Sequence, residues 1–553
     1  MRITPRIPHR LGTQRVNEPP KKTMTSQSPK PNPQLTADEH NKLDRSFIKG
    51  VAWTGASKWS IQIFTWAMTL VIARILTPSD YGIVAMASVF YGAFDLITDF
   101  GIGSSIIMLT GLSKEQVSQI NALSILLGLT GTLVSCAVAV PLGWFFATPD
   151  LSSVVAVMGL GFFINSFRTV PNALLQKERR FKVISLIGVI RSVAQSSTVV
   201  LLAWLGFRYW SLVLGILLSY TLGAALTLAV RRHGLAMPRI SSLTHAAKFS
   251  GQVLVSNLAW YAYSNADFTI AGRVLGQVAL GSYNLAWTLA YTPLEKVTTL
   301  VGSVTPAFFS AVKEDPTALR RYLLRPIEAI ALILFPTMIG MSLVARDAVL
   351  TLLGDKWEAS IPVLQLLALY ASVRSIMPLF PQVLMALRET RFVMWNELIS
   401  LILLPTAFYF GSQWGIHGIA AAWVIAYPVN AVPLYWRVHQ KIGLSHVEFF
   451  RTLLPAITGS ALMSLAVIAA KFVLDGQLEG SVNWLIAQVG PWESSIMLKA
   501  APMLQWVLDG HFGTGVRLAV QVLCGAVAYV LALWVFHRER LLAFRRGLAS
   551  MRK

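Results

Sequence analysis

Long apolar stretches run through most of this sequence, and they restrict its fold more than any other feature. Each stretch is long enough to cross the hydrocarbon core of a bilayer, which takes about 20 helical residues. None alternates with period two, and a helix satisfies its own backbone hydrogen bonds in lipid, so helices are expected rather than barrel strands. With 54% hydrophobic and 13% charged residues, the chain is neither a single soluble domain nor a disordered protein.

The expected fold is an all-α polytopic membrane protein with about fourteen transmembrane helices. The first seven predicted spans are residues 50–73, 81–108, 117–146, 151–174, 183–205, 209–230 and 249–270. The other seven are residues 279–308, 326–345, 360–387, 393–410, 415–436, 452–470 and 518–536.

The predicted spans repeat after six helices. At an offset of 199 residues, Arg74–Gly82 (RILTPSDYG) aligns with Arg273–Gly281 (RVLGQVALG), and each is expected to be a short loop ending on a glycine that opens the next span. A second pair aligns Pro171–Phe181 with Pro381–Phe392 after one inserted residue. Since six is even, the two halves have the same orientation, and a parallel repeat of two six-helix bundles around a central cavity is expected. Chance similarity between apolar segments is the alternative.

Basic residues are distributed unevenly between the predicted loops. With the N-terminus in the cytoplasm, 34 of the 47 Lys and Arg residues lie on the cytoplasmic side and eight on the opposite side. This asymmetry predicts that both termini are cytoplasmic. It also accounts for the net charge of +21, so orientation in the membrane is favoured over nucleic-acid binding as the cause of the basic excess.

The domain boundaries follow from the repeat and from the charge distribution. They are a disordered basic tail (1–46), an N-terminal bundle (47–232), a C-terminal bundle (233–438), helices 13 and 14 (439–537) and a basic tail (538–553). Within them, residues 475–515 are predicted to be a long periplasmic loop with interfacial helices. Docking of a partner protein there is one alternative, and an insertion without a partner is another. A third is that residues 484–508 span the membrane and invert the last helix.

Five basic side chains lie inside predicted spans: Lys58, Arg168, Arg191, Lys296 and Arg374. A cation at the centre of a spanning helix costs roughly 2.5–3.5 kcal/mol on insertion scales. The five are expected to line a cavity that binds an anion, most naturally a phosphate, because guanidinium offers fork-shaped donors and ammonium a compact charge. The alternative, favoured for Lys296 and Arg374, is pairing with intramembrane acids, of which there are also five: Asp95, Asp99, Asp267, Glu295 and Glu397.

Other polar and aromatic side chains cluster on single helix faces at about 100° per residue. On this ground the expected cavity lining also includes Gln62, Asp95, Asp99, Asn257, Tyr261, Trp287, Tyr291 and Glu295. The aromatic residues, with Trp260, either stack against sugar rings or anchor the helices at the membrane interface. Asp95 and Asp99, four residues apart, could bind a coupling cation or a proton.

Sequence signatures of enzymes and cofactors are missing. The chain has no Gly-Lys pair, hence no phosphate-binding loop of the Walker type, and no HExxH, GxSxG or paired-cysteine metal signature. No metal or cofactor is therefore expected. Secondary transport is favoured over ATP hydrolysis and over catalysis.

The start of the predicted transporter resembles a known family. The residues concerned are a Trp early in span one (Trp53), the run ARILTPSDYGIVAMASV (73–89), the run DFGIGSSII (99–107) and the block LLQKERRF (174–181). They resemble the polysaccharide transporter family, the Wzx-type flippases of the multidrug/oligosaccharidyl-lipid/polysaccharide superfamily. The helix pattern extends the resemblance over residues 46–471.

This resemblance implies two six-helix bundles around a V-shaped cavity in a bacterial inner membrane. It also implies movement of an undecaprenyl-pyrophosphate-linked oligosaccharide from the cytoplasmic to the periplasmic leaflet, for lipopolysaccharide or exopolysaccharide synthesis. With such a function, the partner that could dock on residues 475–515 is a polysaccharide polymerase or part of the export machinery. Drug exporters of the superfamily carry an acidic residue in the first helix, where this chain has Lys58, so drug or metabolite export is the less favoured alternative. A membrane-embedded glycosyl or phosphoryl transferase is a third hypothesis.

Overall fold

The computed structural model describes residues 64–99, 103, 106–107, 113–232, 234–237, 258–302, 305–488 and 511–538. Three residues predicted to line the cavity, Lys58, Gln62 and Asn257, lie outside this part of the chain, as do the N-terminal tail and most of the C-terminal tail. The side chains of Asp99 and of residues 475–488 are likewise outside the description.

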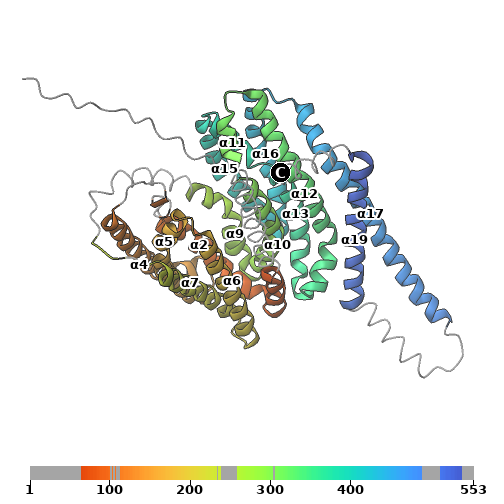
Figure 1. The fold of residues 1–553 in the computed structure, drawn as a ribbon. Helices are drawn as coiled ribbons and strands as arrows, with labels where there is room; N and C mark the ends of the chain where they lie inside the picture. Colours follow the sequence, from red (N-terminus) through yellow and green to blue (C-terminus); the bar gives the residue numbers. More distant parts are fainter. Residues whose placement is uncertain are drawn as a thin grey trace, which may run out of the picture. The chain divides into compact units, whose positions relative to one another are not determined.

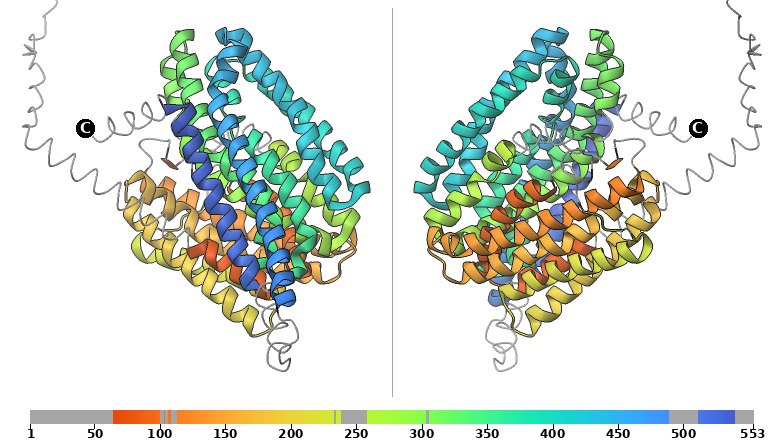
Figure 2. Two further views of the ribbon diagram at one scale, coloured as in Figure 1. Left: turned by 90° about the vertical axis from the view of Figure 1, so that its right-hand side faces the viewer. Right: turned by 90° about the vertical axis from the view of Figure 1, so that its left-hand side faces the viewer.

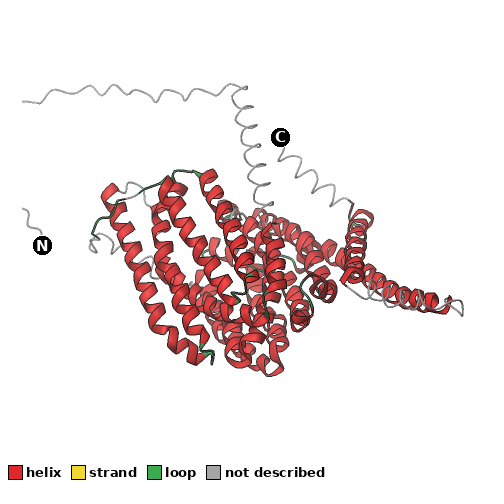
Figure 3. Cartoon of the chain, turned by 90° about the horizontal axis from the view of Figure 1, so that it is seen from below, coloured by secondary structure: helices red, strands yellow, loops and turns green. Residues whose placement is uncertain are grey.

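The described residues form helices joined by short turns, and no strand occurs among them (Figure 3). The N-terminal half contains a helix at Phe64–Ile75, α2 (Pro78–Asp99), α4 (Lys114–Phe145), α5 (Asp150–Lys177), α6 (Phe181–Trp204) and α7 (Tyr209–Val230). The C-terminal half contains a helix at 258–264, α9 (Ala266–Ile270), a π-helical turn η2 (Ala271–Leu275), α10 (Gly276–Gly302), α11 (Thr305–Ala311), α12 (Pro316–Leu352), η3 (Asp355–Ser360), α13 (Ile361–Arg374), α14 (Leu379–Ala386), α15 (Thr390–Gly411), η4 (Ser412–Trp414) and α16 (Gly415–Ile442). Two more helices follow, α17 (His446–Gln488) and α19 (His511–Phe536).

Ten helical stretches of the described chain are long and apolar enough to cross a membrane. Large apolar side chains on them are exposed, among them Ile402 and Ile425, each 72% exposed, and Phe472, which is 81% exposed. Apolar surface of this extent is stable against lipid and not against water. The prediction of a multi-pass helical membrane protein is confirmed.

A large hydrophobic core joins the two halves. It combines residues of α2 and α5 with residues of α10, α13 and α16, and its largest buried side chains include Trp357, Trp423 and Tyr283. A second core lies between α12, α14 and α17. The last two helices, α17 and α19, run side by side against α12 (Figures 1 and 2).

Predicted span 360–387 is two helices in the structure. Helix α13 ends at Arg374, a turn follows at 375–378, and α14 begins at Leu379. Pro378 explains the interruption, because proline lacks the backbone N–H that a continuing helix would need. The break places Arg374 in the last turn of α13, where the helix macrodipole stabilises a cation.

The predicted loop 475–515 begins as a helix. Helix α17 continues to Gln488 and therefore passes the predicted end of the span at residue 470. The remainder of that predicted loop up to residue 510 lies outside the described residues.

Helices α2 and α10 cross in very close contact at two glycines. A methyl group at position 82 would lie 1.7 Å from the carbonyl oxygen of Gln277, and one at position 281 would lie 1.7 Å from that of Pro78. The contact is reciprocal. The two glycines, Gly82 and Gly281, are 199 residues apart, and so are the two residues whose carbonyl oxygens they approach, Pro78 and Gln277, so the contact follows the offset of the sequence repeat. Neither glycine opens a helix, contrary to prediction: α2 begins at Pro78 and α10 at Gly276, so each glycine lies in the second turn.

Hydrogen bonds between the halves surround this crossing. Gln277 donates to the Ser79 hydroxyl at 2.6 Å, and the Trp357 indole donates to the carbonyl oxygen of Ala73 at 2.8 Å. The Lys356 ammonium donates to the carbonyl oxygen of Arg74 at 2.7 Å. All these residues belong to the face that the sequence predicts to be periplasmic, so the two halves are joined there.

The second aligned pair of segments forms equivalent turns. Pro171–Phe181 ends α5 and leads into α6, and Pro381–Phe392 ends α14 and leads into α15. Each turn holds an arginine in the left-handed region, Arg179 with φ 56° and Arg388 with φ 62°. Both turns lie on the predicted cytoplasmic face.

Each of these turns carries a glutamate that pairs with an arginine near the end of its own half. Glu178 pairs with Arg231 at 2.8 Å, and Glu389 pairs with Arg437 at 2.8 Å and also with Lys441. Hydrogen bonds from Lys441 and Arg437 hold the pKa of Glu389 below its usual range. Ion pairs at the protein surface contribute only about 0–1 kcal/mol each, so these pairs are a shared feature of the halves rather than their main support.

We expect alanine at position 82 or 281 to separate α2 from α10, because the added methyl group has no space beside the opposing carbonyl. The measurement is disulfide formation between Ser79→Cys and Gln277→Cys in a protein whose Cys136 and Cys524 are replaced by serine. Cross-linking should fall several-fold with either alanine.

The matched control for this prediction is Gly188→Ala on α6, where an added methyl group meets nothing within 4 Å. It should leave cross-linking unchanged. Equal cross-linking in Gly82→Ala and Gly188→Ala would show that the glycines do not hold the crossing together.

Candidate functional site

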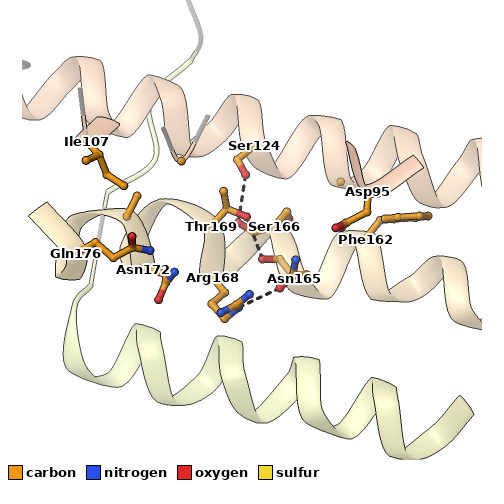
Figure 4. Close-up of a pocket in the computed structure, with 13 residues that line it drawn as sticks. Asp95, Ile107, Ser124, Phe162, Asn165, Ser166, Arg168, Thr169, Asn172 and Gln176 are labelled. Carbon is orange, nitrogen blue, oxygen red and sulfur yellow. Dashed lines mark hydrogen bonds between the residues drawn. The ribbon is translucent and has the colours of Figure 1, made fainter. Parts of the chain in front are cut away.

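A polar cavity of about 380 Å³ lies in the N-terminal half, between α2, α4 and α5. Its polar lining residues are Asp95, Ser124, Asn165, Ser166, Arg168, Thr169, Asn172 and Gln176 (Figure 4). Six of these come from α5, where the series 165, 168/169, 172 and 176 recurs every three to four residues, which places them along one side of the helix. A cavity with this lining is stable inside a membrane only when water or a polar ligand fills it.

Arg168 is the basic residue of this cavity. Its Nε donates to the Asn165 side-chain oxygen at 3.0 Å, which fixes the guanidinium beside α5 (Figure 4). Asp95 of α2 lines the same cavity. The structure thus brings together two of the residues that the sequence predicted to line a cavity.

Arg191 of α6 lies next to Arg168, and both pack on Gly223 of α7. A methyl group at position 223 would lie 2.8 Å from Cδ of Arg191 and 3.2 Å from Cδ of Arg168. Nε of Arg191 donates to the carbonyl oxygen of Ser219 at 2.9 Å, and its guanidinium lies 5.9 Å from the ring centre of Tyr220. Two guanidinium groups this close repel each other, so an anion between them would be strongly stabilised.

A second cavity, of about 390 Å³, lies in the C-terminal half. The polar and aromatic residues of its wall include Trp260, Tyr263, Tyr291, Arg374, Gln382, Glu397, Trp423, Tyr427 and Asn430. Its walls are therefore more aromatic than those of the N-terminal cavity. Lys58, Gln62 and Asn257, which are predicted to line a cavity between the two halves, lie outside the described residues, so that cavity stays a prediction.

Four aromatic rings surround Arg374 in this second cavity. Its guanidinium carbon lies 5.5–6.0 Å from the ring centres of Tyr291, Tyr370, Trp423 and Trp287. One of its nitrogens donates to the Tyr370 hydroxyl at 2.7 Å. No carboxylate of the described chain lies within ion-pair distance, so the rings take the place of the acidic partner that the sequence favoured.

Two acids in this half, one buried and one partly buried, accept hydrogen bonds from neutral donors. Asp267 is fully buried and accepts hydrogen bonds from the Tyr283 hydroxyl at 2.6 Å, the Trp423 indole at 2.9 Å and the Phe268 amide at 2.9 Å. Glu397 accepts one from the Tyr263 hydroxyl. Asp267 thereby ties α9 to α10 and α16, which is a structural role.

The other predicted site residues lie away from the two cavities. Lys296 and Glu295 are exposed on α10, and no ion pair joins them to each other or to another described residue. Tyr261 donates to the carbonyl oxygen of Val89 at 2.9 Å and so bridges the halves. Among the residues whose positions are given, no three His, Cys, Asp or Glu side chains group as metal ligands would.

Several residues of the sites were not found from the sequence. Trp423, Tyr427 and Asn430 lie on one face of α16 at helical spacing, which is a signal that a polar-face search of span twelve would have detected. Gly223 and Tyr370 give no such signal, since their roles depend on which helices pack together.

The sequence matches the model of a family described as polysaccharide biosynthesis protein over residues 71–362, more than half of the chain. The chain belongs to this family. The resemblance inferred from the motifs at 73–89 and 174–181 is confirmed.

Proteins from several bacteria are similar to this chain over most of their length. The lipopolysaccharide biosynthesis protein WzxC of Escherichia coli strain K12 is 24% identical over 79% of this chain and 90% of its own. The succinoglycan biosynthesis transport protein ExoT of Rhizobium meliloti is 25% identical over 77% of this chain and 85% of its own. An uncharacterized membrane protein in the cps region of Klebsiella pneumoniae is 23% identical over 77% of this chain and 90% of its own.

Solved structures show the fold of this family member. The lipid II flippase MurJ in an inward closed conformation superposes with a TM-score of 0.65 at 12% identity, covering 89% of this chain and all of that one. An inward-facing multidrug resistance MATE family transporter of the MOP superfamily superposes with a TM-score of 0.58 at 16% identity. The superposition covers 68% of this chain and 94% of that one. The chain therefore has the fold of these transporters.

We expect Asp267→Ala to lower thermal stability strongly, because the Tyr283 hydroxyl would lose its acceptor and the Trp423 indole would keep only its longer hydrogen bond, of 3.1 Å, to the Tyr283 oxygen. A buried donor without a partner costs about 1–3 kcal/mol. The melting temperature of the purified protein in detergent measures the loss. Glu358→Gln is the control, because Glu358 is 65% exposed and its contact with Arg346 is long, at 3.9 Å. Equal melting temperatures for the two variants would exclude a structural role for Asp267.

Proposed function

We propose that this chain is a secondary transporter that moves a lipid-linked oligosaccharide from the cytoplasmic to the periplasmic leaflet of a bacterial inner membrane. The carrier is an undecaprenyl pyrophosphate, and the product serves surface polysaccharide or exopolysaccharide synthesis. The observation that carries the proposal is the pair Arg168 and Arg191, adjacent on Gly223 beside a polar cavity. Two guanidinium groups offer the fork-shaped donors that a pyrophosphate accepts.

The proposed architecture is two six-helix bundles in parallel repeat, followed by helices 13 and 14, with both termini cytoplasmic. The crossing at Gly82 and Gly281 closes the periplasmic side in this state. Asp95 lies about 20 Å further along α2 than Gly82, at 1.5 Å per residue, toward the cytoplasmic side. The headgroup therefore enters from the cytoplasm, and separation of α2 from α10 releases it outward.

An energy source is available without nucleotide hydrolysis. A membrane potential that is negative inside favours outward movement of an anion by about 2.3 kcal/mol per charge per 100 mV. Export of a drug or metabolite is the second candidate. It is supported by the fold shared with the multidrug transporter, but a pair of arginines is poorly suited to cationic drugs.

We expect Arg168→Gln and Arg191→Gln each to reduce polysaccharide export, because the headgroup loses charge-assisted hydrogen bonds. Such bonds contribute about 1.5–3 kcal/mol, or roughly a 10- to 100-fold change in binding. The assay is complementation of a deletion strain, with measurement of surface polysaccharide and of lipid-linked intermediates retained in the cytoplasmic leaflet. Arg168→Lys and Arg191→Lys should restore part of the export, because lysine returns the positive charge but not the paired donors of the guanidinium group.

Arg232→Gln, at an exposed position, is the control for these substitutions and should export normally. Normal surface polysaccharide in the double variant Arg168→Gln/Arg191→Gln, at normal expression, would reject the proposal. Drug sensitivity of the deletion strain with normal polysaccharide would favour the second candidate.

We expect Gly223→Ala to impair export without changing any charge, because the methyl group displaces both arginine side chains. Export should fall between that of the wild type and that of the arginine variants. Gly188→Ala provides the comparison at an open helical position. Equal export by Gly223→Ala and Gly188→Ala would show that the spacing of the two guanidinium groups is unimportant.

A further inference from the structure

The cavity in the C-terminal half has a chemistry that a pyrophosphate does not require. Trp260 of helix 258–264, Tyr291 of α10 and Tyr427 of α16 give it aromatic walls. Arg374, Gln382 and Glu397 add planar polar groups of different charge. At about 390 Å³, it is within the range of about 300–1,000 Å³ that small-molecule sites occupy.

Polar groups in this cavity make fewer hydrogen bonds to described residues than their donors and acceptors allow. Arg374 has five N–H donors, of which one bond goes to the Tyr370 hydroxyl. Gln382 accepts from the Thr305 hydroxyl at 2.6 Å, and no bond from its amide N–H group to a described residue is found. One carboxylate oxygen of Glu397 accepts from Tyr263, and the other has no partner in the described part of the protein. The cavity thus offers donors and an acceptor together.

This combination selects one kind of ligand. Among the described residues of this cavity, Arg374 is the one guanidinium and is balanced by one carboxylate, Glu397, so the cavity has no net charge that would attract a phosphate or a cationic drug. The N-terminal site differs, because two guanidinium groups there outnumber the carboxylate of Asp95. A sugar ring is neutral, its hydroxyl groups both donate and accept hydrogen bonds, and its apolar face packs on aromatic rings. We propose that the C-terminal cavity binds a pyranose unit of the transported glycan, through stacking on Trp260 and Tyr291 and hydrogen bonds to Arg374, Gln382 and Glu397.

The inference rests on the proposed function and adds that each half of the protein binds a different part of the substrate. The arginine pair of the N-terminal half binds the headgroup, which is common to all such lipids. The C-terminal cavity binds sugar, and therefore sets which glycan is transported.

The test uses the purified full-length protein in lipid nanodiscs and two probes. One is polyprenyl pyrophosphate without sugar, and the other is the same lipid carrying the oligosaccharide that accumulates in the deletion strain. Trp260→Leu and Gln382→Ala should each weaken binding of the glycosylated lipid about tenfold, the effect of losing one stacking or polar contact. Binding of the sugar-free lipid should stay within about twofold of the wild type.

Two further variants separate local loss from misfolding. Trp395→Leu replaces a tryptophan on α15 that is 57% exposed and does not line the cavity, and it should bind both lipids normally. Trp260→Tyr keeps an aromatic face and should recover most of the affinity lost in Trp260→Leu.

Each outcome decides a different claim. If Trp260→Leu and Gln382→Ala bind the glycosylated lipid as the wild type does, or lose both lipids equally, the glycan subsite is overturned. If the wild type binds both lipids equally well, the subsite is also overturned while the headgroup site stands. If the wild type binds neither lipid, the proposed function itself fails.

Discussion

The absence of water from the hydrocarbon core is the constraint on which the rest of this structure depends. A polar group in a spanning helix must have a partner in the protein, in a hydrated cavity or in a ligand. The protein satisfies this condition in different ways. Asp267 is buried and accepts three hydrogen bonds, whereas Arg374 is surrounded by aromatic rings and lines a cavity. The first arrangement stabilises the fold, and the second leaves donors available for a ligand.

Glycine contacts between helices explain how apolar helices of this protein associate inside a membrane. Lipid provides little hydrophobic drive for one apolar helix to pack on another, so close backbone approach supplies the attraction. At Gly82 and Gly281 this approach joins the two halves, and at Gly223 it leaves space for two arginine side chains. The same property of glycine, a missing side chain, therefore serves both a contact between halves and a binding site.

The sequence predicted the helices well because their signal is local. Apolar length identified α4, α5, α6 and α7 almost to their ends, and the repeat aligned the two glycines that meet at the crossing. Interruptions inside long apolar segments were missed, as at the end of α13. The ring of aromatics around Arg374 was also missed, because Trp287, Tyr370 and Trp423 come from three helices and meet only through packing.

Two cavities in separate halves have a consequence for how the proposed transport would be driven. A ligand shifts a conformational equilibrium only when it binds the two states with different affinity. A substrate held by its headgroup in one half and by its sugar in the other spans both, so movement of the halves changes how well both ends fit. If the glycine crossing separates during transport, as proposed, this contact is either formed or broken, and the protein would have two discrete states. Substrate that bridges the halves can therefore favour one state, and a headgroup without sugar cannot do so to the same extent.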